Sequence, residues 1–154
     1  MILKEYFEDL AWRHRDIGHT ENSEHFCAIG DESQVHADTI LEYPCVLYGE
    51  DAEEEFIGNA ENLRRPYRIV LLFLDHVIDT SDFCMIEETE MKMDRIAEDF
   101  IRKFWKDKSY MTDSAGFAIS HIENKDASLF GAMLTFTVEI PFCLHEIESP
   151  FMPD

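Results

Sequence analysis

This sequence has no glycine-rich phosphate loop: it holds only six glycines in 154 residues and no GxxxxGK[ST] or GxGxxG pattern. It also has no GxSxG nucleophile motif, and none of its four cysteines belongs to a CxxC pair. The longest apolar run, residues 69–74, has the length of a strand and is far shorter than the ~20 residues that span a bilayer. We therefore expect no cofactor, no bound metal, no membrane span and no enzyme activity.

Basic residues are scarce. The chain has 33 Asp and Glu against 13 Lys and Arg, a net charge of −20, and residues 1–60 carry 15 of the acids but only 3 of the bases. Such a surface repels nucleic-acid phosphates and anionic lipid. Sequence-specific binding of nucleic acid and binding to membranes are therefore not expected. A basic protein or a cation is the partner that this charge attracts, and solubility alone is the alternative explanation.

The cysteines and the N-terminus predict an intracellular protein. Acidic and basic side chains interrupt any apolar run in the first ten residues, so no signal peptide is expected. Without a secretory context, cysteines stay reduced and act as small apolar side chains. Buried thiols are the expectation for all four, which are Cys27, Cys45, Cys84 and Cys143.

The clearest periodic pattern predicts a long amphipathic helix over about residues 83–107. Its apolar residues follow the i, i+3, i+4, i+7 spacing and are Met93, Ile96, Ala97, Phe100, Ile101, Phe104 and Trp105. Acids gather near its start and bases near its end, as the helix dipole favours. Acid-before-base pairs at i, i+4 are expected for Glu88–Lys92, Glu98–Arg102 and Asp99–Lys103. A shorter amphipathic helix is predicted over residues 1–15, with Gly18 as its stop signal.

Four strands are predicted, at residues 43–48, 67–78, 115–122 and 132–140. The second is continuously apolar, which is typical of a central strand buried on both faces. The last two form a hairpin through turn residues 124–126. Together the elements predict a single α+β domain over residues 1–154. The apolar stripe of the long helix must cover something, and a sheet is the available partner.

The apolar pattern does not settle the secondary structure of three segments. Residues 25–29 fit either a short strand or irregular chain, and residues 32–41 fit a short helix. Residues 145–154 contain two prolines and are predicted to be a flexible tail or to pack on another molecule.

Two charged clusters are candidates for binding. The run from Glu50 to Glu55 fits a solvated loop or the tip of a hairpin, and we assign its possible assembly role to Asp51, Glu53, Glu54 and Glu55. The only basic cluster is Arg64, Arg65 and Arg68, which either pairs with neighbouring acids or docks on an acidic patch of a partner.

Catalytic and metal sites have weaker support. Asp75, His76 and Asp79 lie where the apolar strand ends, and a carboxyl group there with a raised pKa would hint at an active site. A carboxyl group at the end of a strand is also a common way to cap a loop. His14, His19 and His25 are spaced by five and six residues, which does not match the three or four that metal ligands on one helix need.

This order of elements resembles the tail-completion or tail-terminator proteins of long-tailed phages and prophages, in the variant found in gut Bacteroidetes elements. The best matching parts are Tyr43-Pro-Cys, the strand ending in Asp75, and Glu123-Asn-Lys followed by Gly131 and a Thr-Phe-Thr strand. The resemblance spans about residues 1–145. It implies an α+β sandwich in which a four-stranded, mainly antiparallel sheet packs on the long helix and on the N-terminal helix. The family assembles as a homo-oligomeric ring, commonly of six copies. The ring sits at the head-proximal end of the tail tube, stops its polymerisation and contacts other tail or connector proteins.

The resemblance makes a structural assembly protein of a phage-like tail the leading expectation. Its localisation is then the cytoplasm of the bacterial host and the assembled tail particle. A negative lumen lets DNA slide through such a ring, because like charges repel. The acidic residues 50–55 then face either the lumen or a neighbouring copy. The alternative is a small, acidic, cytoplasmic binding or regulatory module that recognises a basic protein, and a third hypothesis is an enzyme with its site at Asp75, His76 and Asp79.

Overall fold

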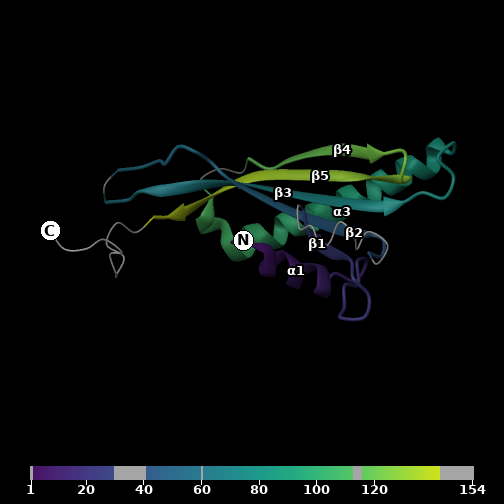
Figure 1. Ribbon diagram of the computed structural model, residues 1–154, viewed down its shortest axis with the longest axis horizontal. Coiled ribbons are helices and arrows are strands. Elements are labelled where there is room, and N and C mark those ends of the chain that lie inside the picture. The colour runs from purple at the N-terminus through teal and green to yellow at the C-terminus, as the bar shows by residue number, and fades with distance from the viewer. Residues whose placement is uncertain (1, 30–40, 60, 113–115, 143–154) are drawn as a thin grey trace.

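The computed structural model describes residues 2–29, 41–59, 61–112 and 116–142, and Figure 1 shows their arrangement. In chain order the elements are α1 (Lys4–Arg13), β1 (Phe26–Ala28), β2 (Cys45–Ala52), β3 (Arg64–His76), α3 (Phe83–Lys108), a short 3-10 turn (Ser109–Met111), β4 (Ala118–Asn124) and β5 (Leu129–Pro141). The α+β class, the long helix, the N-terminal helix and the final hairpin are as predicted from the sequence.

The sheet has five strands in the order β1-β2-β3-β5-β4. The pairs β2–β3, β3–β5 and β5–β4 are antiparallel, and β1 pairs with β2 in parallel. The predicted four-stranded sheet is thus corrected to a mixed sheet of five. The fifth strand is β1, whose three residues alone are too few to show a strand pattern in a sequence.

The central ladder joins β3 to β5 over thirteen residue pairs, from Arg64 opposite Pro141 to His76 opposite Leu129. The continuous apolar run of β3 is explained by this position, because strands flank it on both sides. The strand begins at Arg64, three residues before its predicted start. Likewise Glu50, Asp51 and Ala52 belong to β2 and not to a loop, because they pair with β3 residues Ile69, Arg68 and Tyr67.

The helices α1 and α3 cover one face of the sheet. α1 lies against β1 and β2, and α3 runs across β3 and β5 (Figure 1). Phe7 of α1 is wholly buried and stacks on Phe100 and Phe104 of α3, with ring centroids 6.2 and 5.9 Å away. It also contacts Tyr48 of β2 at 5.9 Å and Phe136 of β5 at 6.1 Å. One phenyl ring therefore joins two helices and two strands.

The opposite face of the sheet holds a second, smaller apolar cluster. Its buried members are Cys45, Leu74 and Leu129, and partly buried leucine and isoleucine side chains surround them. These residues alternate along their strands with those that face the helices, as the two-residue period of a strand requires.

α3 begins at the N-cap Asp82, whose carboxylate accepts a hydrogen bond from the backbone N–H of Met85 at 3.2 Å. Five of the seven predicted stripe residues are buried, Ile101 is half-buried, and Trp105 is 43% exposed near the C-terminal end. Of the predicted side-chain pairs, Glu98–Arg102 forms at 3.4 Å. Lys92 instead contacts Asp75 of β3 at 3.8 Å, and Lys103 contacts Asp107 at 3.1 Å.

One further expectation is corrected, and others concern residues outside the described ranges. Cys27 and Cys45 are buried, but Cys84 is exposed because it lies on the solvent side of the first turn of α3. Cys143, the helix suggested for residues 32–41 and the tail of residues 145–154 lie wholly or largely outside the described residues.

Candidate interaction surfaces

The acidic end of the β2–β3 hairpin is the first candidate. We call residues 51–59 and 61–66 the acidic arm: they comprise the end of β2, the connection to β3 and the start of β3. In Figure 1 the arm extends past the helices at one end of the long axis. The backbone N–H of Glu53 bonds the carbonyl oxygen of Pro66 at 2.9 Å, so the two chains of the arm stay paired where β2 ends.

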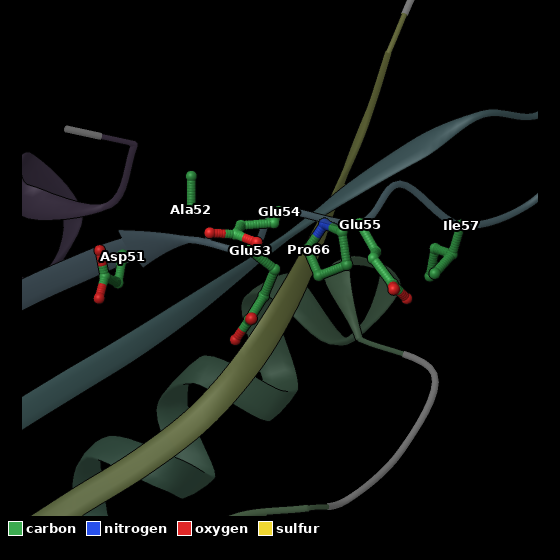
Figure 2. A pocket seen from close by; sticks show the side chains of 7 residues that line it. All are labelled: Asp51, Ala52, Glu53, Glu54, Glu55, Ile57 and Pro66. Atoms are coloured by element: carbon green, nitrogen blue, oxygen red, sulfur yellow. The ribbon is translucent and has the colours of Figure 1, made fainter.

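A hollow of about 640 Å³ opens on the arm, lined by Asp51, Ala52, Glu53, Glu54, Glu55, Ile57 and Pro66. Figure 2 shows that the four carboxylates spread in different directions and do not converge on one point. None of the four has a hydrogen-bond or ion-pair partner among the described residues. The arrangement presents negative charge outward; it does not form a cage for a single cation.

Glu50 begins the acidic run, but its carboxylate is not presented outward. Its carboxylate accepts hydrogen bonds from the Tyr48 hydroxyl at 2.7 Å and from the backbone N–H of Ile2 at 2.9 Å. Burial and the nearby Glu50 carboxylate raise the pKa of the Tyr48 phenol far above its ordinary value. Glu50 therefore ties the N-terminus to β2, and the residues after it are the ones presented outward.

The arm is held in place at its base. Phe56 meets Phe142 edge to face at 5.0 Å, and the Arg65 guanidinium lies over the rings of Phe56 and Tyr67 at 5.1 and 5.8 Å. The turn requires Gly58, whose φ is +97° and where a Cβ atom would lie 2.0 Å from the Asn62 carbonyl oxygen. The carboxylates are thus carried on a fixed scaffold.

The three arginines of the predicted docking patch do not lie together. Successive residues of a strand point to opposite faces, so Arg64 and Arg68 share one face of β3 while Arg65 points to the other. Arg64 bonds the carboxylate of Glu139 on β5, and Arg65 stacks on the aromatic rings of the arm. Arg68 is exposed, opposite Asp51 of β2 and Thr137 of β5 in the strand register.

A second hollow, which the sequence reading did not find, lies between the end of α1 and the middle of α3. It has a volume of about 480 Å³, and four basic and three acidic side chains line most of it. The lining residues are Arg15, Asp16, Lys92, Arg95, Ile96, Glu98, Asp99 and Arg102. We call it the arginine hollow, since it gathers three of the chain's arginines.

Most charges of the arginine hollow are already paired. Arg102 contacts Glu98 at 3.4 Å and Asp99 at 3.0 Å, and Asp99 also contacts the ring of His14 at 3.0 Å. Arg15 and Arg95 have no ion-pair partner among the described residues. They are eighty positions apart in the sequence, so no local motif could have indicated that they share a site.

A histidine held by two carboxylates links the sheet to α3. His121 of β4 places Nε2 2.7 Å from Asp94 and Nδ1 2.9 Å from Glu90, both on α3. Both bonds require both ring nitrogens to carry protons, which is the imidazolium form. The hydrogen bond to Asp94, joined by the charges of Asp94 and Glu90, raises the pKa of His121 above its ordinary value.

We expect this contact to stabilise the fold in acid and not in alkali. The pKa of His121 is higher in the folded chain than in the unfolded chain. Its contribution to stability is therefore complete below the unfolded pKa of about 6.5, and it disappears as the pH rises through the folded pKa. Substituting His121→Gln should therefore lower the unfolding free energy at pH 6 and leave it nearly unchanged at pH 9. Urea unfolding at the two pH values measures this, and an equal loss at both would contradict it. NMR titration of His121 in the Asp94→Asn variant, where its pKa should fall, is the control.

A third hollow, of about 310 Å³, lies beside α1 and β1. Among its lining residues are Trp12, which is half exposed, and the glutamates Glu8, Glu21 and Glu24. Its wall is fixed by His19, which is buried, accepts a hydrogen bond from the His25 backbone N–H at 2.9 Å, and contacts Glu8 at 3.4 Å. The lining holds three carboxylates against the one amine of Lys4, and this excess of negative charge suits a basic side chain.

Asp75, His76 and Asp79 take structural positions at the end of β3. The Asp75 carboxylate accepts a bond from the His76 backbone N–H at 2.8 Å and contacts Lys92. Asp79 accepts bonds from the hydroxyl and the backbone N–H of Ser81, at 2.6 and 3.0 Å. These bonds lower the pKa of Asp79, so the raised value considered from the sequence is wrong for this residue.

Within the described ranges, no three His, Cys, Asp or Glu side chains gather in a way that suits a metal ion. No helix in this part of the chain has both the length and the apolar character of a membrane span. The chain matches no protein-family model, and none of the curated proteins is a significant match to it.

Proposed function

We propose that this chain is a structural assembly protein of a phage-like tail. It forms a homo-oligomeric ring where the tail meets the head and ends the growth of the tail tube. The acidic arm is the observation that carries this proposal. Its four carboxylates are exposed, lack partners among the described residues, and stand on a scaffold fixed by Phe56 and Phe142. A rigid, charged projection of this kind contributes little to its own fold, which favours a role between molecules.

The sheet offers a second surface for assembly. β4 forms one end of the strand order and pairs only with β5, so the backbone groups along its outer side have no strand partner within the described residues. Open sheet edges are ready templates for pairing with another chain. The β4 edge is therefore a candidate surface for contact with another copy.

Disrupting the gene in a strain that produces the particles tests the proposal. Electron microscopy should show tails of uncontrolled length that lack heads, because nothing stops the tube or joins it to the connector. Supplying the wild-type gene should restore normal particles. Supplying the arm-reversed variant, Glu53→Lys, Glu54→Lys and Glu55→Lys, should not. A matched variant, Glu5→Lys, Glu87→Lys and Glu88→Lys, changes the charge equally on exposed helix positions and should restore them.

A second candidate function has support from one observation. The hollow beside Trp12, with three glutamates in its lining, suits a lysine or arginine side chain of a basic protein. Particles with normal tails in the disrupted strain would contradict the tail proposal and favour this binding module instead.

A further inference from the structure

The acidic arm and the arginine hollow carry opposite charges, and each has unpaired groups. We propose that the arm of one copy binds in the arginine hollow of the neighbouring copy. The contact would place Glu53, Glu54 or Glu55 against Arg15 and Arg95. This inference rests on the ring assembly proposed above, and it names the contact that would join successive copies.

Arg15 and Arg95 are exposed and have no carboxylate partner among the described residues, although the whole chain has 33 acids and only 13 bases. Within the arginine hollow, Glu98, Asp99, Lys92 and Arg102 all have partners. The groups left over are Asp16, Arg15 and Arg95, which give an excess of positive charge. A guanidinium group binds a carboxylate through two parallel hydrogen bonds, so acidic side chains are its best matched ligand.

The size of the hollow agrees with such a ligand. Its volume of about 480 Å³ is large enough for more than one side chain. Carboxylate side chains of the arm can enter it while the backbone of the arm keeps its shape, which the Phe56–Phe142 contact and the stacking of Arg65 hold. Little conformational entropy is then lost on binding, which favours association.

The positions of the two surfaces exclude a contact within one copy. In Figure 1 the arm lies at one end of the long axis, and α1 runs away from it toward the other end. Arg15 follows the C-terminal end of α1, so arm and hollow are separated along the molecule. A contact between two different surfaces is heterologous, and repeating it with a suitable rotation closes a ring. The arm is then assigned to the hollow of a neighbouring copy.

A charge exchange between two variants tests the contact. The hollow-reversed chain carries Arg15→Glu and Arg95→Glu, and the arm-reversed chain carries Glu53→Lys, Glu54→Lys and Glu55→Lys. Each variant alone should fail to associate, since like charges then face each other. An equal mixture should associate again, because each arm now meets a hollow of opposite charge in an alternating ring. Sedimentation velocity at low ionic strength measures this, and added salt should weaken both wild type and mixture.

Photo-crosslinking identifies the surfaces directly. A benzophenone side chain at position 54 of the otherwise wild-type chain should crosslink to a second copy near residues 15 and 95. The Glu5→Lys, Glu87→Lys, Glu88→Lys variant is the control and should associate like wild type. A mixture that stays monomeric while wild type associates overturns the contact, as do crosslinks at other surfaces. A wild-type chain that remains monomeric at millimolar concentration also overturns it.

These outcomes are separate from the fate of the proposed function. Crosslinks at other surfaces, together with tails of uncontrolled length in the disrupted strain, would remove this contact and leave the tail role standing. Association through the arm, together with normal tails in that strain, would keep the contact and remove the tail role.

Discussion

Replacing Gly131 with alanine should destabilise the fold more than any other single methyl group added to the sheet. An added Cβ at this position of β5 would lie 1.8 Å from the carbonyl oxygen of Phe73 and 2.9 Å from its carbonyl carbon. Both are backbone atoms of the paired strand β3, so neither can move aside without opening the central ladder. We expect a loss of about 3 kcal/mol or more in unfolding free energy. Urea denaturation followed by far-ultraviolet circular dichroism measures it.

Gly49 provides the matched control, since it is also a strand glycine with an ordinary backbone conformation. There an added Cβ would meet the side chain of Ile29, whose Cδ1 atom is the nearest at 3.3 Å, while Cβ and Cγ1 lie at ordinary contact distances of 3.8 and 4.0 Å. The end of an isoleucine side chain can rotate by a few tenths of an ångström, so Gly49→Ala should change stability by less than about 1 kcal/mol. Similar losses for the two variants would show that the close approach at Gly131 is not the cause.

The second large effect is expected at Phe7. Substitution by alanine removes the ring that contacts Tyr48, Phe100, Phe104 and Phe136, and it leaves a cavity at the junction of both helices with the sheet. Truncation of a buried phenylalanine costs about 3–5 kcal/mol. Guanidinium unfolding should show this as a lower midpoint with an unchanged slope.

Phe83 is the control for Phe7, because its side chain is 82% exposed at the first residue of α3. Phe83→Ala should change the unfolding free energy by about 0.5 kcal/mol at most. Phe7→Leu, which keeps an apolar side chain in the cavity, should fall between the two alanine variants. A Phe7→Ala protein as stable as Phe83→Ala would mean that α1 does not pack as described.

The sequence predicts well those elements that are long and have a regular spacing of apolar residues. The stripe of α3 has five buried members, from Met93 to Phe104, because amphipathic periodicity over many residues leaves little ambiguity. The β4–β5 hairpin follows from turn residues and alternation. The fifth strand β1 was left open because three residues carry no period, and its place beside β2 is set by tertiary contacts.

Side-chain partners were harder to predict than elements. Lys92 has a favourable acid one turn earlier, yet it contacts Asp75 on another strand, since the fold brings that carboxylate close. Glu50 looked like part of a solvated run, but the Tyr48 hydroxyl and the Ile2 backbone hold it. The arginine hollow joins residues of α3 with two residues just after α1, and the spacing of charges along the sequence does not indicate that they lie close together.

The long ladder between β3 and β5 also affects how the chain reaches its native state. β3 is followed by α3 and β4 before its partner β5 is available, so the apolar run of β3 has a long-range pairing to complete. Such non-local pairing slows folding and leaves strand edges open to other chains meanwhile. During synthesis, β3 can pair early with β2 alone, through the local hairpin that carries the acidic arm. The negative charges of that hairpin then repel the same segment of other nascent chains, which gives the arm a protective role during folding.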